Sequence, residues 1–223
     1  PCGVKAANLL KTIKVPFMKI ASSEITNLEL IDYISKMKIP MMISTGMTSI
    51  SEISKVVEIV QSNNCPFSLL HCVSSYPAKH SDANLSTISY LQKTFDIPVG
   101  FSDHTLGIDV SLAAVALGAT IIEKHFTLDK NMTGPDQKLS IDPKELSDLV
   151  KKIRIIEKAM GHSRKTIYKT EESFRTNMRK SLGTNQNIPA NTIIKRSMIT
   201  SFRPGIGIPP YLIDEFIGRK TKK

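Results

Sequence analysis

The chain has 223 residues, a hydrophobic fraction of 41% and a formal net charge of +10. Its longest apolar run, residues 110–122, is too short to span a bilayer, and no charged-then-apolar leader precedes it. Aromatic residues make up only 6% of the chain and Trp is absent, so the positive charge indicates attraction of small anions, or a simple solvated surface, rather than nucleic-acid binding. Cys2, Cys65 and Cys72 show no paired spacing, which indicates reduced thiols in a cytoplasmic protein.

Short apolar runs rich in β-forming residues alternate with amphipathic segments along the first two thirds of the chain. Most of these runs begin with proline, which is tolerated at the start of a strand but not in its middle. A repeat of about 25 residues for one strand and one helix is typical of βα units in a parallel sheet. The predicted strands are 16–22, 40–45, 66–72, 98–103 and 119–126, and the predicted helices between them are 26–37, 49–61, 85–94 and 107–117.

The segment 49–61 shows the helical pattern most clearly. Thr48 or Ser49 can cap the helix, and Glu52 falls in its first turn. The apolar residues then recur at helical spacing, so that one face would be buried. That face consists of Ile50, Ile53, Val56, Val57 and Val60.

Polar side chains gather where each predicted strand ends. In a (β/α)8 barrel this edge carries the active site, whereas the competing flavodoxin-like sheet would need a glycine-rich phosphate loop that we do not find. A barrel needs eight strands, and only five are predicted before residue 165. We therefore expect an α/β fold, a partial (β/α)8 TIM barrel containing about strands 4–8, with roughly three βα units missing at the N-terminal side.

The pattern changes after a long predicted helix, 142–161, which Asp142 can cap and Gly161 can end. We expect residues 1–164 to form the C-terminal part of the barrel and 165–179 to form a polar linker. Residues 180–223 contain short β-like pieces and turn residues, which predicts a small, mostly β domain.

His104 and His125 follow two successive strands, and Asp103 and Glu123 lie beside them. Imidazole and carboxylate ligands suit a divalent metal such as Mn²⁺ or Mg²⁺. The alternative is two unrelated surface histidines. His71 also ends a strand, and we expect it to be a packed, hydrogen-bonded histidine rather than a third ligand.

A second group, Lys19, Ser22, Ser44 and Ser102, could hold a phosphate and a carboxylate at the same edge, although Ser22 and Ser44 could instead cap helices. Asp136 could contact sugar hydroxyls or transfer a proton, or be an exposed turn residue. Arg203, before Pro-Gly, could clamp a ligand or simply lie in a turn.

Seven motifs together give the chain a resemblance to a known family. They are KIASSE, STGM, LLHCVSSYP, GFSDHTLGI, AVALGATIIEKHFTLD, GPDQ and RPGIGIPP, in this order. The chain thereby resembles the sialic acid synthase family, which includes N-acetylneuraminate, legionaminate and pseudaminate synthases. The resemblance implies a phosphoenolpyruvate-condensing barrel followed by an antifreeze-like (SAF) domain at 180–223. In the family this domain usually runs somewhat past the residue at which this chain stops.

The resemblance also implies residue roles. His104 and His125 correspond to metal ligands, and Glu24 and Asp136 to residues near the acylated sugar. Arg203 corresponds to an SAF-domain arginine that reaches a partner's barrel, which implies a domain-swapped homodimer. The residues that correspond to the phosphoenolpyruvate site are Lys19, Ser22, Ser44, Ser74, Tyr76 and Ser102; Ser74 stands where Asn or Thr is common, and Gln137 replaces a histidine often found after the aspartate.

The implied activity is condensation of phosphoenolpyruvate with an N-acylated hexosamine, such as N-acetylmannosamine, to give a nine-carbon 2-keto sugar acid and phosphate. The alternatives are an inactive fragment or a non-catalytic sugar-binding subunit of such a synthase. A barrel aldolase that forms a Schiff base at Lys19 is a third alternative.

Overall fold

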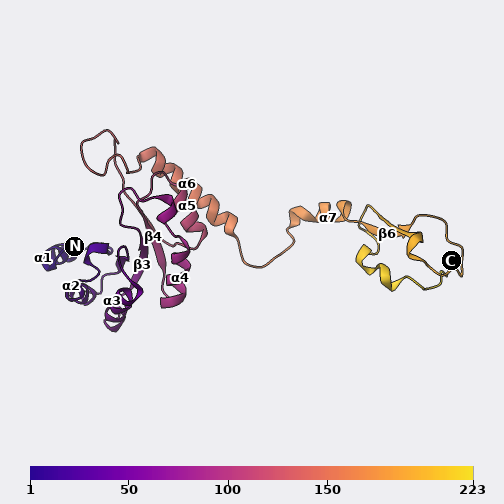
Figure 1. Cartoon of the computed structure of the whole chain (residues 1–223), viewed down its shortest axis with the longest axis horizontal. Coiled ribbons are helices and arrows are strands. Elements are labelled where there is room, and N and C mark those ends of the chain that lie inside the picture. The colour runs from indigo at the N-terminus through magenta and orange to yellow at the C-terminus, as the bar shows by residue number, and fades with distance from the viewer. Residues whose placement is uncertain (223) are drawn as a thin grey trace. The chain divides into compact units, whose positions relative to one another are not determined.

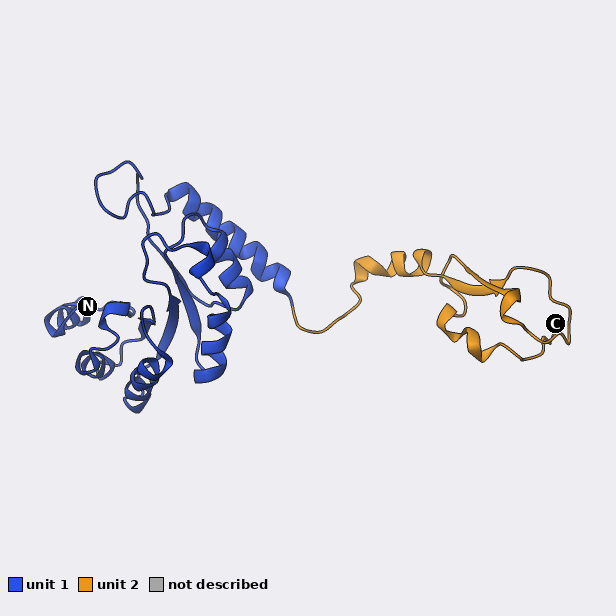
Figure 2. Ribbon diagram, viewed as in Figure 1, with its two compact units in different colours: residues 1–161 blue, residues 162–223 orange. Residues whose placement is uncertain are grey.

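The computed structural model describes residues 1–222, which form two compact units (Figure 2). The first unit is Pro1–Gly161, and the second begins at His162. The sequence pattern predicts that the barrel part ends at residue 164, three residues after the end of the first unit.

The first unit contains a parallel sheet of five strands: β1 (Met18–Ile20), β2 (Met41–Ser44), β3 (Phe67–Cys72), β4 (Val99–Asp103) and β5 (Ile122–Lys124). Each strand pairs with the next strand along the chain, in the order β1-β2-β3-β4-β5. Sequential order is the arrangement of a (β/α) barrel, whereas a flavodoxin-like sheet reverses its order near the first strand. The predicted α/β half-barrel with five strands is therefore confirmed.

The helices of the first unit are α1 (Val4–Thr12), α2 (Leu28–Ser35), α3 (Ile50–Ser62), α4 (Ser86–Phe95), α5 (Asp109–Ala116) and α6 (Pro143–Met160) (Figure 1). Helix α1 contacts α2, α2 contacts α3, and α5 contacts α6. The four helices predicted between strands all form, each within a few residues of its expected bounds.

Two helix starts follow from local sequence. Ser49 accepts the Glu52 N–H at the start of α3 while the Glu52 side chain accepts the Ser49 N–H, and Asp142 and Glu145 do the same at α6. These reciprocal bonds satisfy backbone donors that a helix leaves unpaired at its N-terminus.

The prolines that open the strands contribute to the sheet through their carbonyl groups. The carbonyl oxygens of Pro40, Pro66 and Pro98 accept from the backbone N–H groups of Met18, Met41 and Leu69 on the preceding strand. A proline has no N–H to donate but keeps its acceptor, which explains why it is tolerated at this position.

The core lies between the sheet and the helices. Alternate strand residues such as Ile20, Ile43, Leu69 and Phe101 are buried there against apolar faces of α2, α3 and α4. This leaves the other set of strand side chains, including Lys19 and Glu123, on the opposite face, as the two-residue period of a strand requires.

The second unit contains η3 (Lys169–Glu171), α7 (Glu172–Met178), β6 (Ser181–Thr184), η4 (Arg196–Met198), β7 (Ile199–Phe202) and η5 (Pro210–Glu215). Strands β6 and β7 form an antiparallel pair. Among its described residues only Ser181 is buried. The segment 165–179, predicted as a linker, contains α7, and the SAF assignment of 180–223 stays a prediction. Across residues 1–222, no helix is both long and apolar enough to cross a bilayer.

Candidate active site at the carboxyl edge of the sheet

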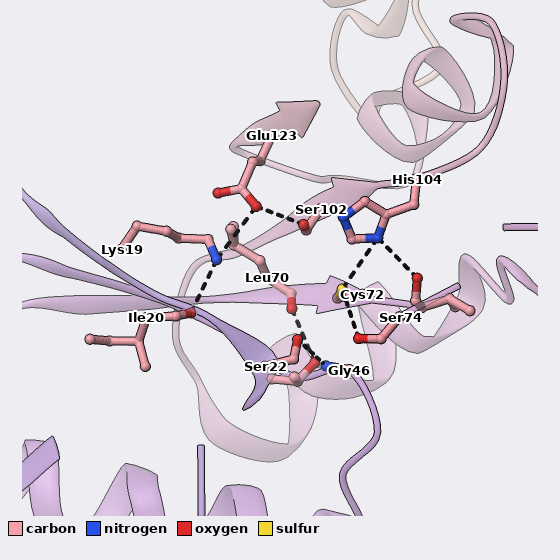
Figure 3. A network of polar contacts seen from close by, with 12 residues as sticks. Lys19, Ile20, Ser22, Gly46, Leu70, Cys72, Ser74, Ser102, His104 and Glu123 are labelled. Atoms are coloured by element: carbon pink, nitrogen blue, oxygen red, sulfur yellow. Dashed lines mark hydrogen bonds and ion pairs between the residues drawn. The ribbon is translucent and has the colours of Figure 1, made fainter. Parts of the chain in front are cut away.

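The carboxyl ends of β1 to β5 bring most of the predicted site residues to one edge (Figure 3). Register fixes this arrangement: Cys72 lies opposite Ser102, and Ser102 lies opposite Glu123. Because the strands are parallel, the loops that follow them also start at this edge.

Lys19 and Glu123 are in contact although they lie on the first and the last strand of the sheet. The Lys19 Nζ lies 3.4 Å from Oε1 of Glu123, although these residues are on β1 and β5. In a flat sheet, four strand spacings of about 4.8 Å would separate them by roughly 19 Å. The contact is possible because the sheet curves as a barrel wall does, which directs both side chains inward.

Ser102 belongs to the same group. Its Oγ donates to Oε1 of Glu123 at 2.7 Å, and Lys19 Nζ also donates to the Ile20 carbonyl at 3.0 Å (Figure 3). One cation, one carboxylate and one hydroxyl are therefore in contact at the edge.

A second group forms around Gly46, in the loop after β2. The Gly46 N–H donates to Ser22 Oγ at 2.9 Å, which joins the loops after β1 and β2. Ser74 Oγ lies 3.9 Å from Cys72 Sγ. Ser44 ends β2 nearby in the chain, and its Oγ is buried without a hydrogen-bond partner among the described residues. A buried hydroxyl without a partner is costly, and a ligand atom is one way to satisfy it.

His104 follows β4 and is buried. Its Nδ1 lies 3.0 Å from the Val73 carbonyl oxygen and 3.8 Å from Cys72 Sγ. A carbonyl oxygen can only accept, so Nδ1 carries the proton and Nε2 keeps its lone pair. This tautomer suits a metal ligand oriented by a backbone partner.

His104 and Cys72 each change the pKa of the other. Burial lowers the pKa of His104, but contact with Cys72, the Val73 carbonyl and the negative charge of Glu123 outweigh it, so the pKa is raised. Burial raises the pKa of the Cys72 thiol, but hydrogen bonds with His104, Ser22 and Ser102 and the charge of His104 leave it lowered.

The two predicted metal ligands lie side by side. The ring centroids of His104 and His125 are 5.3 Å apart and the rings are nearly perpendicular. With metal–nitrogen bonds of about 2.1 Å, each centroid would lie roughly 3 Å from a shared ion, so the separation fits one metal. In residues 1–222, no group of three His, Cys, Asp or Glu side chains is arranged to hold a metal, which makes this a two-histidine donor set.

Tyr76 and Asp136 border the histidines. The Tyr76 ring centroid lies 4.3 Å from that of His104 and 5.7 Å from that of His125. Asp136 Oδ2 lies 3.6 Å from Nδ1 of His125, and about half of the Asp136 side chain is exposed. The turn residue Asp136 therefore lies next to His125, and its role stays a prediction.

Two predicted residues make other contacts. Glu24, in the turn η1 (Ser22–Glu24), accepts from Asn27 Nδ2 at 3.1 Å and is half-buried. Arg203 belongs to the second unit, where its Nε donates to the Met178 carbonyl at 3.0 Å. Their roles remain predictions.

His71 is packed, as the sequence predicts. It is buried, and its Nε2 lies 2.7 Å from the Ala83 carbonyl. It lies on the helix-facing side of β3, one residue before Cys72, so it has no part in the two-histidine group.

The sequence patterns place Cys72 and Glu123 among the polar residues at the strand ends, but they assign no site role to either of them or to Gly46. The sequence did contain a signal for each: Gly46 follows a strand directly, and Cys72 and Glu123 share the strand face of Ser102. Their contacts across several strands could be found only in three dimensions.

A curved parallel sheet of sequential strands places the protein in the α/β-barrel class. Its cationic, hydroxyl and imidazole groups gather at the carboxyl ends of the strands, where proteins of this class carry their active sites. The particular family follows from comparison with known proteins: residues 1–165 match the NeuB family model, and the chain belongs to the NeuB family.

Several relatives are named as synthases of sialic-type sugar acids. The chain is 41% identical over its whole length to N,N'-diacetyllegionaminic acid synthase of Campylobacter jejuni, covering 68% of that protein. It is 39% identical over 97% of its length to human N-acetylneuraminate-9-phosphate synthase, covering 61% of that protein. A crystal structure of N-acetylneuraminic acid synthetase from Leptospira borgpetersenii, in complex with citrate, is 42% identical, with a TM-score of 0.75 over 78% of this chain and 61% of that one. The chain thus spans roughly two thirds of the length of these relatives.

Proposed function

We propose that the protein takes part in the condensation of phosphoenolpyruvate with an N-acylated hexosamine, giving a nine-carbon 2-keto sugar acid and phosphate. The observation that carries this proposal is the convergence of Lys19, Ser22 and Ser102 beside the His104–His125 pair. The names of the two relatives described above, N,N'-diacetyllegionaminic acid synthase and N-acetylneuraminate-9-phosphate synthase, support it.

His104 and His125 would hold a divalent cation, Mn²⁺ or Mg²⁺, through their imidazole nitrogens. When bound, such an ion supplies Lewis-acid polarisation of the sugar aldehyde. The Val73 carbonyl orients His104, and Asp136 adjoins His125.

The proposed binding site for the phosphate and carboxylate groups uses hydrogen-bond donors that are already present at this edge. Lys19 Nζ provides positive charge, and the hydroxyls of Ser22, Ser44 and Ser102 can donate to phosphate and carboxylate oxygens. Ser44 Oγ has no partner among the described residues, and Ser102 can turn from Glu123 to an anion. Hydrogen-bond donors fixed before the reaction stabilise charge as it develops on the departing phosphate.

The chemistry balances with one water. C3 of phosphoenolpyruvate forms a bond to the aldehyde carbon, and the water oxygen adds at C2. The resulting tetrahedral carbon expels phosphate by cleavage of the C–O bond, which leaves the 2-keto group. Glu24 and Asp136 are proposed to contact the sugar or move protons, and Ser74 and Tyr76 to contribute to the binding loop.

We further propose a cytoplasmic protein that acts as a domain-swapped homodimer, in which Arg203 of one SAF domain completes the other barrel's site. No nucleic-acid or membrane partner is proposed.

The test is phosphate release by the 223-residue chain with phosphoenolpyruvate, N-acetylmannosamine and Mn²⁺. We expect His104→Ala and His125→Ala each to lower metal-dependent turnover at least a hundredfold, a magnitude of about 3 kcal/mol in the barrier. His80→Ala is the matched control because His80 is exposed and its imidazole makes none of the contacts described above for this edge. Unchanged turnover in either site variant would remove the metal assignment, and sugar binding without phosphate release would favour the non-catalytic alternative.

A further inference from the structure

The first unit contains a buried ion pair that the proposed reaction does not use. Lys124 Nζ, on β5, lies 2.9 Å from Asp103 Oδ2, on β4, and the exposed fractions of the two side chains are 4% and 0%. Both side chains point to the helix-covered face of the sheet, away from Lys19 and Glu123.

The hydrogen bonds of Asp103 are satisfied within the protein. Its Oδ1 accepts from the backbone N–H and the hydroxyl of Thr105, both at 2.8 Å. Its Oδ2 accepts from Ser111 Oγ, on α5, at 2.5 Å as well as from Lys124. Lys124 also donates to the Thr105 carbonyl at 2.7 Å. The network therefore contacts the chain on both sides of His104.

The pair lies at the last rung of the β4–β5 ladder. Asp103 is opposite Lys124 in register, and the next residues along the two strands are His104 and His125. Beyond this rung the main chain of each histidine accepts one backbone hydrogen bond from a loop: Ala78 N–H donates to the His104 carbonyl and Ile141 N–H to the His125 carbonyl, both at 2.9 Å. The His104 ring is bonded in addition to the Val73 carbonyl. The ion pair is thus the final cross-strand connection before the two imidazoles.

Stability alone is a weak reason for such a pair. Removing two charges from water offsets most of their attraction, and a well-packed apolar pair of similar volume is often equally stable. An apolar pair, however, would not fix the relative position of two strand ends as two charge-assisted hydrogen bonds do.

We infer that Asp103 and Lys124 are positioning residues that hold the ends of β4 and β5 so that His104 and His125 can share one metal ion. The part of this inference that concerns metal rests on the proposed function. The part that concerns the two strand ends can be tested without any metal.

The test variant is Asp103→Asn combined with Lys124→Met in the 223-residue chain. It removes both charges but keeps the size of the side chains and the acceptor for Thr105. Lys124→Met alone is the second variant, in which Asp103 keeps three of its four hydrogen bonds. Ile31→Val is the control, because it removes a buried methyl group from α2 without touching β4 or β5.

We measure Mn²⁺ affinity by calorimetric titration and, without metal, hydrogen exchange of the Ala78 and Ile141 amides. In both test variants we expect Mn²⁺ binding to weaken about tenfold or more, as on loss of an outer-shell partner. Exchange at both amides should accelerate at least severalfold, while exchange in β2 and β3 stays as in wild type. Ile31→Val should leave both readouts unchanged.

Equal exchange at Ala78 and Ile141 in a folded variant and in wild type would overturn the inference, and so would equal Mn²⁺ affinity if wild type binds Mn²⁺. If wild type binds no Mn²⁺ but exchange accelerates as expected, the positioning role stands and the metal assignment of the proposed function fails.

Discussion

At Gly46, the lack of a side chain allows the surrounding site residues to pack closely. An added Cβ would lie 2.3 Å from Ser74 Oγ, 2.8 Å from Ser22 Oγ and 3.1 Å from Cys72 Sγ. Gly46 is not among the residues with positive φ, so the need for glycine comes from close packing rather than from backbone conformation. The glycine lets three loops approach each other and keeps its own N–H directed at Ser22.

Gly46→Ala should therefore lower the free energy of unfolding by about 1–3 kcal/mol through overpacking. Adding Ser74→Ala removes the nearest atom, so the double variant should recover part of this loss. Urea unfolding of the two single variants, the double variant and wild type measures the interaction as a double-mutant cycle. Strictly additive effects would show that the loops relax without a clash.

At the scale of elements, strand β3 is connected to the segment before α4 through His71. The turn η2 (His80–Asp82) ends next to Ala83, whose carbonyl accepts the His71 hydrogen bond. Burial lowers the pKa of His71, and the bond to Ala83 offsets only part of this effect. The folded protein therefore prefers neutral His71 more strongly than the unfolded chain does.

This preference makes stability depend on pH with a defined sign. Below the unfolded pKa of about 6.5, the unfolded chain binds the proton more readily, so His71 lowers stability as pH falls and has no such effect above that pH. We expect His71→Gln to flatten the profile of unfolding free energy between pH 7.5 and 5. The difference in slope from wild type should reach at most ~1.4 kcal/mol per pH unit. Parallel wild-type and variant profiles would show that His71 titrates equally in both states.

Strands β1 and β5 are shorter than their sequence patterns predict. The pattern predicted strands at 16–22 and 119–126, but the ladders include only Met18–Ile20 and Ile122–Lys124. Pairing defines a strand, and each of these two has a neighbour on only one side within the described sheet. In both segments the apolar run is therefore longer than the part that pairs with the single neighbouring strand.

At the scale of the whole molecule, the two units differ in how much they bury. The first contains the continuous hydrophobic core, whereas the second has one buried residue among those described. The segment 162–168, with which the second unit begins, is exposed and has neither helix nor strand. Such segments are the preferred sites of proteolytic cleavage.

Limited trypsin digestion should therefore cut first after Arg164 or Lys165, and the fragment that begins at Pro1 should persist because its core protects it. Mass spectrometry of early digestion products identifies the cut. Replacing both residues with Gln should delay cleavage there without altering the thermal stability of the first unit. Early cuts inside β1 to β5 would contradict this expectation.

The sequence by itself determined the order of strands and helices, the caps of α3 and α6 and the expected half-barrel, because these depend on local patterns and on residues a few positions apart. Only the tertiary structure showed that Lys19 meets Glu123, that Val73 and Cys72 contact His104, and that Asp103 pairs with Lys124. Those contacts join residues 21 to 104 positions apart, and they exist because the sheet curves and sets its register, which no local pattern encodes.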